Sequence, residues 1–271
     1  MLSKVQRIVV AADLGETLPD VLAEAGLVAR TFGAELTLVH AIPEAPEGSP
    51  DWDAVSGEAE QLLLKVKEEQ AREGVKVSGS FRIRAEEPSD SIISTADDLG
   101  ADLVVLGAGK RTTLERALLG TTAERVLARC HHPVWVARPP RITQLRRILC
   151  AIDVSEPSRE ALATAAFLAR TFVSGLTLLS VVPPGSGSGP SPLSAMEREI
   201  DLHGIELSRA LREGKVEDRI VEVADEVVPD LVVIGSAGRT GLRRLLGGKN
   251  TAEKLLRKMP CSLLAVPPVK H

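Results

Sequence analysis

An internal repeat constrains the fold of this chain more than any other feature of its sequence. The segment 7–43, which begins RIVVAADLGE, aligns without gaps on the segment 147–183, which begins RILCAIDVSE. The run DLVVLG at 102–107 likewise matches DLVVIG at 230–235, at a slightly smaller offset. Because repetition on this scale indicates repeated structural units, we predict a tandem duplication.

The duplication sets the expected domain boundaries. With 271 residues, the chain has room for two domains of about 135 residues each. We predict one domain at residues 1–140 and the other at 141–271, with Pro139 and Pro140 ending the first.

Each half alternates apolar runs with amphipathic segments. In the first half, the runs at 8–11, 36–39, 103–106 and 134–136 are continuous and apolar, as expected of strands buried on both faces of a parallel sheet. The segment between the first two runs has apolar residues at helical spacing. These are Leu18, Val21, Leu22, Ala25, Ala29 and Phe32. Strand, helix and strand in this order predict right-handed crossovers and an α/β fold.

The two halves differ in the middle. In the first half, residues 51–74 are long and charged enough for a full helix, and 75–84 (VKVSGSFRIR) are predicted to form a strand. In the second half, the Gly/Ser/Pro-rich segment 183–192 is predicted to be a flexible loop. A short helix at 193–203 and a strand at 205–211 are expected to follow.

Composition excludes several classes of protein. The charges nearly balance, with 33 Lys and Arg against 37 Asp and Glu, and aromatic residues are scarce, so nucleic acid is an unexpected partner. The N-terminus has only a short apolar run and is interpreted as neither a signal peptide nor a membrane helix. Cys130, Cys150 and Cys261 are too few and too scattered for a disulfide framework. We therefore expect a cytoplasmic protein with buried or partly buried thiols.

The stretch GAGKRTT at 107–113 resembles a phosphate loop but does not match one. The motif GxxxxGK[ST] requires a glycine at position 104 and Ser or Thr after the lysine, whereas the chain has Val104 and Arg111. ATPase chemistry of the phosphate-loop kind is therefore not predicted.

A ligand site is expected where strand order reverses, beyond the carboxyl ends of the strands. Asp153 follows the first strand of the second half, and Gly235 follows the fourth. Glycines there are expected to take positive φ and let the backbone approach a ligand. Asn250 and Thr251 are placed to open a helix, whose first amide groups favour an anion. The segment from Gly235 to Thr251 can therefore hold phosphates.

At these residues the chain resembles the universal stress protein family in its tandem form. The family pattern of glycine, two residues, glycine, nine residues and glycine occurs as Gly235, Gly238 and Gly248. The resemblance implies two open five-stranded parallel sheets of the adenine-nucleotide-binding, Rossmann-like kind, with strand order 3-2-1-4-5. It also implies that the last strands of the two units, PVWVARP and SLLAVPP, pair antiparallel, giving an intramolecular pseudo-dimer. Association of two chains into a homodimer is left open.

The resemblance implies a site residue by residue. In the second half, the positions that it implies are Asp153, Val181, Gly235, Gly238 and Gly248. The predicted site there also includes Ala151, Ile152, Arg239, Lys249, Asn250 and Thr251. In the first half, the weaker counterparts are Asp13, Ala41, Gly107, Lys110, Gly120 and Thr121. The implied ligand is ATP, with or without Mg²⁺.

Both halves depart from the family pattern. Lys110 replaces the second glycine in the first half, at a cost of about 1 kcal/mol if φ there is positive. In the second half, Lys249 replaces the expected Ser or Thr, and one extra residue precedes Thr251. The hypothesis is that the second half binds ATP and the first binds it weakly or not at all. The alternative is an interaction module that binds another ligand or none.

No catalytic arrangement or metal site is predicted. Asp13 and Asp153 are the only acidic residues expected near the ligand, and an aspartate that ends a strand is more often a capping or ribose-binding group than a general base. Slow ATP hydrolysis is left open, and the chain is not interpreted as an enzyme. His131 and His132 are interpreted as solvated turn residues. The expected partners are an adenine nucleotide and an unidentified protein, without membrane or nucleic acid.

Overall fold

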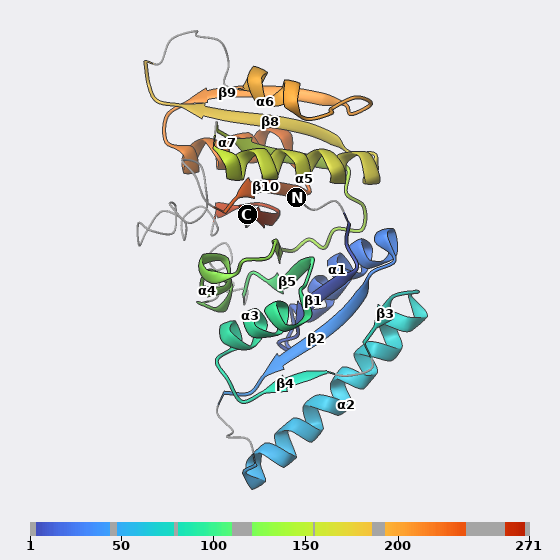
Figure 1. Ribbon diagram of the computed structural model, residues 1–271. Coiled ribbons are helices and arrows are strands. Elements are labelled where there is room, and N and C mark those ends of the chain that lie inside the picture. Colours follow the sequence, from blue (N-terminus) through green and yellow to red (C-terminus); the bar gives the residue numbers. More distant parts are fainter. Residues whose placement is uncertain are drawn as a thin grey trace. The chain divides into compact units, whose positions relative to one another are not determined.

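The computed structural model describes two compact units of the chain (Figure 1). The described residues are 4–43, 48–78, 81–109, 121–153, 155–185, 193–236 and 258–268. The described residues up to Thr143 form the N-terminal unit, and those from Gln144 onward form the C-terminal unit.

The N-terminal unit is a parallel sheet with helices between its strands. Its elements are β1 (Arg7–Ala11), α1 (Leu18–Phe32), β2 (Glu35–Ala41), α2 (Pro50–Arg72), β3 (Lys76–Val77), β4 (Arg82–Arg84), α3 (Pro88–Leu99), β5 (Leu103–Gly107), α4 (Thr121–Arg129) and β6 (Val134–Ala137). The strand order is β3-β2-β1-β5-β6, and β4 also pairs with β2. Every pairing within the unit is parallel.

The C-terminal unit repeats this arrangement. Its elements are β7 (Arg147–Ile152), α5 (Glu156–Phe172), β8 (Gly175–Val182), α6 (Leu193–Glu199), β9 (Leu207–Glu213), α7 (Val216–Val227), β10 (Leu231–Gly235) and β11 (Ser262–Val266). The order is β9-β8-β7-β10-β11, again parallel throughout. The α/β fold and the strand order 3-2-1-4-5 are therefore confirmed in each unit, whereas the pseudo-dimer stays a prediction.

Two details of the predicted elements are wrong. The predicted strand at 75–84 is two short strands, β3 and β4, which pair with different parts of β2. The predicted helix at 193–203 is shorter, since α6 ends at Glu199 and the Asp201 carboxylate then accepts a hydrogen bond from the His203 N–H at 3.0 Å. That bond closes a turn, in which an aspartate side chain competes with helical backbone pairing.

The repeated aspartate after each third helix has a structural role. The Asp102 carboxylate accepts hydrogen bonds from the Gln6 and Arg7 N–H groups, at 2.8 and 2.9 Å. Asp230 does the same for the Arg146 and Arg147 N–H groups, at 2.7 and 2.8 Å. Asp102 thus holds the start of β1 beside β5, and Asp230 holds the start of β7 beside β10.

The helix ends differ between the units. In the N-terminal unit, α1 and α3 end at Gly33 and Gly100, both in the left-handed conformation that favours glycine. In the C-terminal unit, α5 and α7 end at Val173 and Val228, with φ of 56° and 47°. A β-branched residue at positive φ is strained, because its Cβ crowds the following carbonyl.

One buried polar pair occurs on the inner side of α1. The Glu24 side chain is 0% exposed, and its carboxylate accepts a hydrogen bond from the Trp135 Nε1–H at 2.6 Å. Thr164 occupies the matching position of α5. The pair gives the indole of Trp135 the partner that a buried Trp needs.

None of the described helices combines the length and the apolar character that a membrane crossing requires.

Candidate functional site

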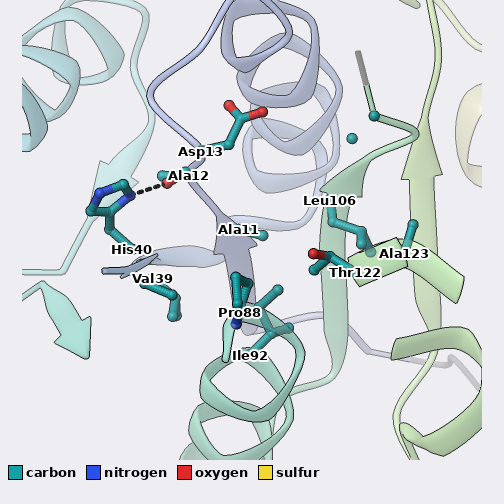
Figure 2. Close-up of a pocket in the computed structure, with 13 residues that line it drawn as sticks. Ala11, Ala12, Asp13, Val39, His40, Pro88, Ile92, Leu106, Thr122 and Ala123 are labelled. Carbon is teal, nitrogen blue, oxygen red and sulfur yellow. Dashed lines mark hydrogen bonds between the residues drawn. The ribbon is translucent and has the colours of Figure 1, made fainter. Parts of the chain in front are cut away.

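A cavity of about 240 Å³ opens at the carboxyl ends of the strands in the N-terminal unit (Figure 2). It lies where the strand order reverses between β1 and β5, the position at which open α/β sheets bind ligands. Its lining residues are Ala11, Ala12, Asp13, Val39, His40, Ala41, Pro88, Ile92, Leu106, Gly107, Gly109, Thr122 and Ala123. The wall is mainly apolar, with a few polar groups, as is usual for small-molecule sites.

Asp13 forms one polar edge of this cavity. Its Oδ1 accepts a hydrogen bond from the Gly15 N–H and its Oδ2 accepts one from the Thr17 hydroxyl, both at 3.0 Å. The side chain is exposed, and a carboxylate has about four acceptor positions, so capacity for a ligand hydroxyl remains. Asp13 therefore orders the turn before α1 and can also accept from a ligand.

The end of β2 turns backbone groups toward the cavity. The Val39 carbonyl accepts from the Ala12 N–H, and the Ile42 N–H donates to the Arg84 carbonyl, both at 2.8 Å. Residues of a parallel strand pair alternately to the two sides, so Ala41 has its N–H and carbonyl on the β1 side. Since β1 ends at Ala11, the Ala41 backbone borders the cavity.

His40 is a lining residue that the sequence did not single out. Its Nδ1 lies 2.7 Å from the Ala12 carbonyl oxygen, a contact drawn in Figure 2. A carbonyl only accepts, so Nδ1 carries the proton and donates. The only sequence signal was a histidine at the end of a strand, where the other half has Ser180.

Two glycines on the border of this cavity have different roles. Gly107 lines the cavity without a positive φ, and a Cβ there would lie 3.2 Å from Val21 Cγ2 and 3.3 Å from Thr17 Oγ1. Gly109 has a φ of 103° and also lines the cavity. The residue that needs glycine's conformational freedom is therefore Gly109, one position before Lys110.

Two helices present their first turns to the cavity. Pro88 and Ile92 come from the start of α3, and Thr122 and Ala123 come from the start of α4 (Figure 2). Unpaired N–H groups and the helix dipole make such termini favourable for anions. Thr121, a predicted site residue, is the first residue of α4 and is exposed.

The equivalent residues of the C-terminal unit are more strongly engaged within the protein. Asp153 Oδ1 accepts from the Ser155 N–H at 2.9 Å, from the Ser158 hydroxyl at 2.7 Å and from the Ser155 hydroxyl. Ala151 and Ile152 are buried at the end of β7. Asp153 is thus held in the turn before α5, two residues ahead of Ser155, the N-cap residue of that helix.

The ladder between the first two strands is also longer in this unit. The β7–β8 register reaches Ile152 opposite Ser180, whereas the β1–β2 register stops at Ala11 opposite Val39. In a parallel ladder the extra step engages the backbone of the next residue, Val181. Val181, a predicted ligand neighbour, therefore differs in its environment from its counterpart Ala41.

The prediction that Gly235 takes a positive φ is wrong. The φ of Gly235 does not lie in the positive region. A Cβ there would lie 2.8 Å from both the carbonyl carbon and the carbonyl oxygen of Pro157. The absence of a side chain lets α5 pack directly on the end of β10. Glycine is thus needed at this position for contact between a helix and a strand.

Part of each predicted loop lies outside the described residues. In the C-terminal unit this applies to Gly238, Arg239, Gly248, Lys249, Asn250 and Thr251, and in the N-terminal unit to Lys110 and Gly120.

The prediction that His132 is a solvated turn residue is wrong. Its Nδ1 lies 2.8 Å from the Ala101 carbonyl oxygen and its Nε2 lies 2.8 Å from Asp97 Oδ1, so the ring joins the end of α3 to the start of β6. All three cysteines are buried and free, as predicted, and burial raises the pKa of the Cys150 thiol. In the described part of the chain, His, Cys, Asp and Glu side chains form no group of three that could hold a metal ion.

Comparison with known proteins identifies the family. The model of the universal stress protein family matches residues 4–138 and again 144–267. The universal stress protein E homolog of Haemophilus influenzae is 30% identical over 211 residues, covering 67% of each chain. A universal stress protein structure from Archaeoglobus fulgidus covers 99% of this chain and 98% of its own, with a TM-score of 0.79 at 22% identity.

A further solved structure covers about one unit. It is a universal stress protein in complex with cAMP, 25% identical over 45% of this chain and 97% of its own, with a TM-score of 0.36.

The two successive matches to the family model and the relative in Haemophilus influenzae lead to one conclusion: the chain belongs to the universal stress protein family and carries its domain twice in tandem.

Proposed function

We propose that this chain is an adenine-nucleotide-binding regulator of the stress response, with ATP as its ligand. The observation that carries the proposal is the cavity at the strand reversal of the N-terminal unit, which has the Ala41 backbone, Asp13 and two helix N-termini on its border. These groups suit a base, a ribose hydroxyl and an anion respectively.

The size of the cavity limits what it encloses. Its 240 Å³ lies below the roughly 300–1,000 Å³ of pockets that hold drug-sized ligands. The N-terminal cavity therefore suits the nucleoside part of the ligand, and its phosphates would continue past Gly109. Lys110 follows immediately, in place of a glycine of the family pattern.

The tight ATP site is proposed in the C-terminal unit, on the strength of its sequence. Gly238 and Gly248 keep the family spacing there, and Arg239 and Lys249 supply positive charge for a triphosphate. Asn250 and Thr251 suit the start of a helix that receives an anion. The proposal is therefore one tight site in the second unit and one weaker site in the first.

Calorimetry with ATP tests this assignment. The wild-type chain should show one tight site, and Gly238→Trp should weaken it by at least about tenfold, which corresponds to 1.4 kcal/mol. Lys110→Gly is the matched variant in the first unit and should strengthen the weaker site. Two equally tight sites in the wild type, or tight binding that survives Gly238→Trp, would contradict the assignment.

The alternative function is an interaction module with altered loops and another ligand or none. The longer β7–β8 ladder favours it for the C-terminal unit, because it engages the Val181 backbone within the sheet. Mass spectrometry of small molecules released by denaturing the purified protein separates the two functions. Bound adenine nucleotide supports the proposed function, and a different metabolite supports the alternative.

A further inference from the structure

We propose that His40 is a positioning residue of the N-terminal cavity. Its imidazole holds the Ala12 carbonyl and thereby leaves the Ala41 backbone available to the edge of a purine base. This inference rests on the proposed function, because it explains how the base would be recognised, although the role of His40 within the sheet can be tested without any ligand.

The hydrogen bonds of Ala12 give the first step. Its N–H donates to the Val39 carbonyl at 2.8 Å, which is an ordinary ladder bond to β2. Continuation of the ladder would bring the Ala41 N–H to the Ala12 carbonyl. That carbonyl instead accepts from His40 Nδ1 at 2.7 Å, and among the described residues no backbone bond joins it to Ala41.

The C-terminal unit shows what happens without the histidine. Ser180 occupies the position of His40 and is buried, with 2% of its surface exposed. There the register continues to Ile152 opposite Ser180. The two units thus align in sequence and have the same strand order. The ladder between their first two strands is one step shorter in the N-terminal unit, where the His40 imidazole donates to the Ala12 carbonyl.

The freed backbone has a definite chemistry. Ala41 carries one N–H donor and one carbonyl acceptor on the side of the cavity, and apolar Val39 and Ile92 lie on its wall. A planar base with a ring-nitrogen acceptor beside an amino group fits this pair of groups, and adenine offers both. The imidazole makes no contact with the base in this arrangement, so His40 acts through Ala12.

Amide hydrogen exchange on the ligand-free chain tests the role of His40 directly. The Ala41 amide should exchange rapidly in the wild type. In His40→Ser, which installs the residue of the other unit, it should gain at least about tenfold protection as it pairs with Ala12. His40→Asn retains a side-chain N–H donor and should leave the Ala41 amide unprotected.

Binding of AMP supplies the functional readout. In a Gly238→Trp background, which disables the proposed tight site, His40→Ser should weaken AMP binding about threefold to tenfold, the range expected for one lost hydrogen bond. His40→Asn should restore the wild-type affinity.

The two readouts separate the possible failures. If AMP binds none of these proteins but the exchange pattern holds, the proposed nucleotide site in this unit is wrong and the positioning role stands. If the Ala41 amide is already protected in the wild type, or if His40→Asn behaves like His40→Ser, the positioning role is overturned.

Discussion

The two units of this protein share a strand order and differ in how their repeated residues are used. Asp102 and Asp230 have the same role in both units. Gly107 and Gly235 also occupy matching positions, yet only Gly235 lies against a helix backbone. Matching residues in a duplicated chain therefore share their place in the fold more reliably than their contacts.

The largest expected difference comes from these two glycines. Gly235→Ala should lower the free energy of unfolding by about 2–3 kcal/mol, because the new Cβ meets the rigid backbone of Pro157 at 2.8 Å. Gly107→Ala should cost about 1 kcal/mol or less, because Val21 and Thr17 meet the Cβ with side-chain atoms that can move. Urea unfolding followed by circular dichroism measures both changes in the free energy of unfolding. Equal losses of stability in the two variants would contradict the different roles of these glycines.

Part of this contrast could be predicted from the sequence. The repeat and the apolar runs were sufficient for two α/β units and for the positions of Asp13 and Asp153 after the first strands, because these depend on local pattern. The strand order came from the resemblance to the family. The reason for the glycine at position 235 is the helix backbone that packs beside it, and a local sequence pattern does not reveal that neighbour. His40 was missed because its partner is a backbone carbonyl, which leaves no residue type to recognise.

A smaller difference is expected at the helix ends. Val173→Gly should stabilise the protein by roughly 0.5–1 kcal/mol, since relief of the left-handed strain exceeds the entropy that glycine adds to the unfolded chain. The reverse change at the matching helix end, Gly33→Val, should destabilise it by about 1–2 kcal/mol. Thermal unfolding of the two variants checks the signs, and a loss of stability in Val173→Gly would show that the valine side chain makes a contact worth more than the strain.

The smallest expected difference concerns the repeated arginines. Arg170 pairs with Asp201 at 2.9 Å, and Arg30 pairs with Glu73 at 3.6 Å. The His203 N–H, followed by Arg170, lowers the pKa of Asp201 below its ordinary value. A carboxyl whose pKa is lower in the folded state stabilises the protein above the unfolded pKa of about 3.9 and loses that contribution as pH falls through the folded value.

Asp201→Asn should therefore lower the urea midpoint slightly at pH 7, and this difference from the wild type should vanish in strong acid. High salt should also reduce it, because the side chain is exposed and its interactions are screened. Glu73→Gln is the control at the longer ion pair and should show a smaller shift at pH 7. If Asp201→Asn shifts the urea midpoint equally at pH 7 and in strong acid, the ionised Asp201 carboxylate does not contribute to the acid sensitivity of this unit.

The buried pair of Glu24 and Trp135 has an optical consequence. The only tryptophans of the chain, Trp52 and Trp135, belong to the N-terminal unit, and the sequence contains no tyrosine. Indole emission therefore reports on one unit alone, with the Trp135 ring buried beside a carboxylate in the native state. The first half thus carries a built-in fluorescent label, so its unfolding can be followed apart from that of the second half without attaching a dye.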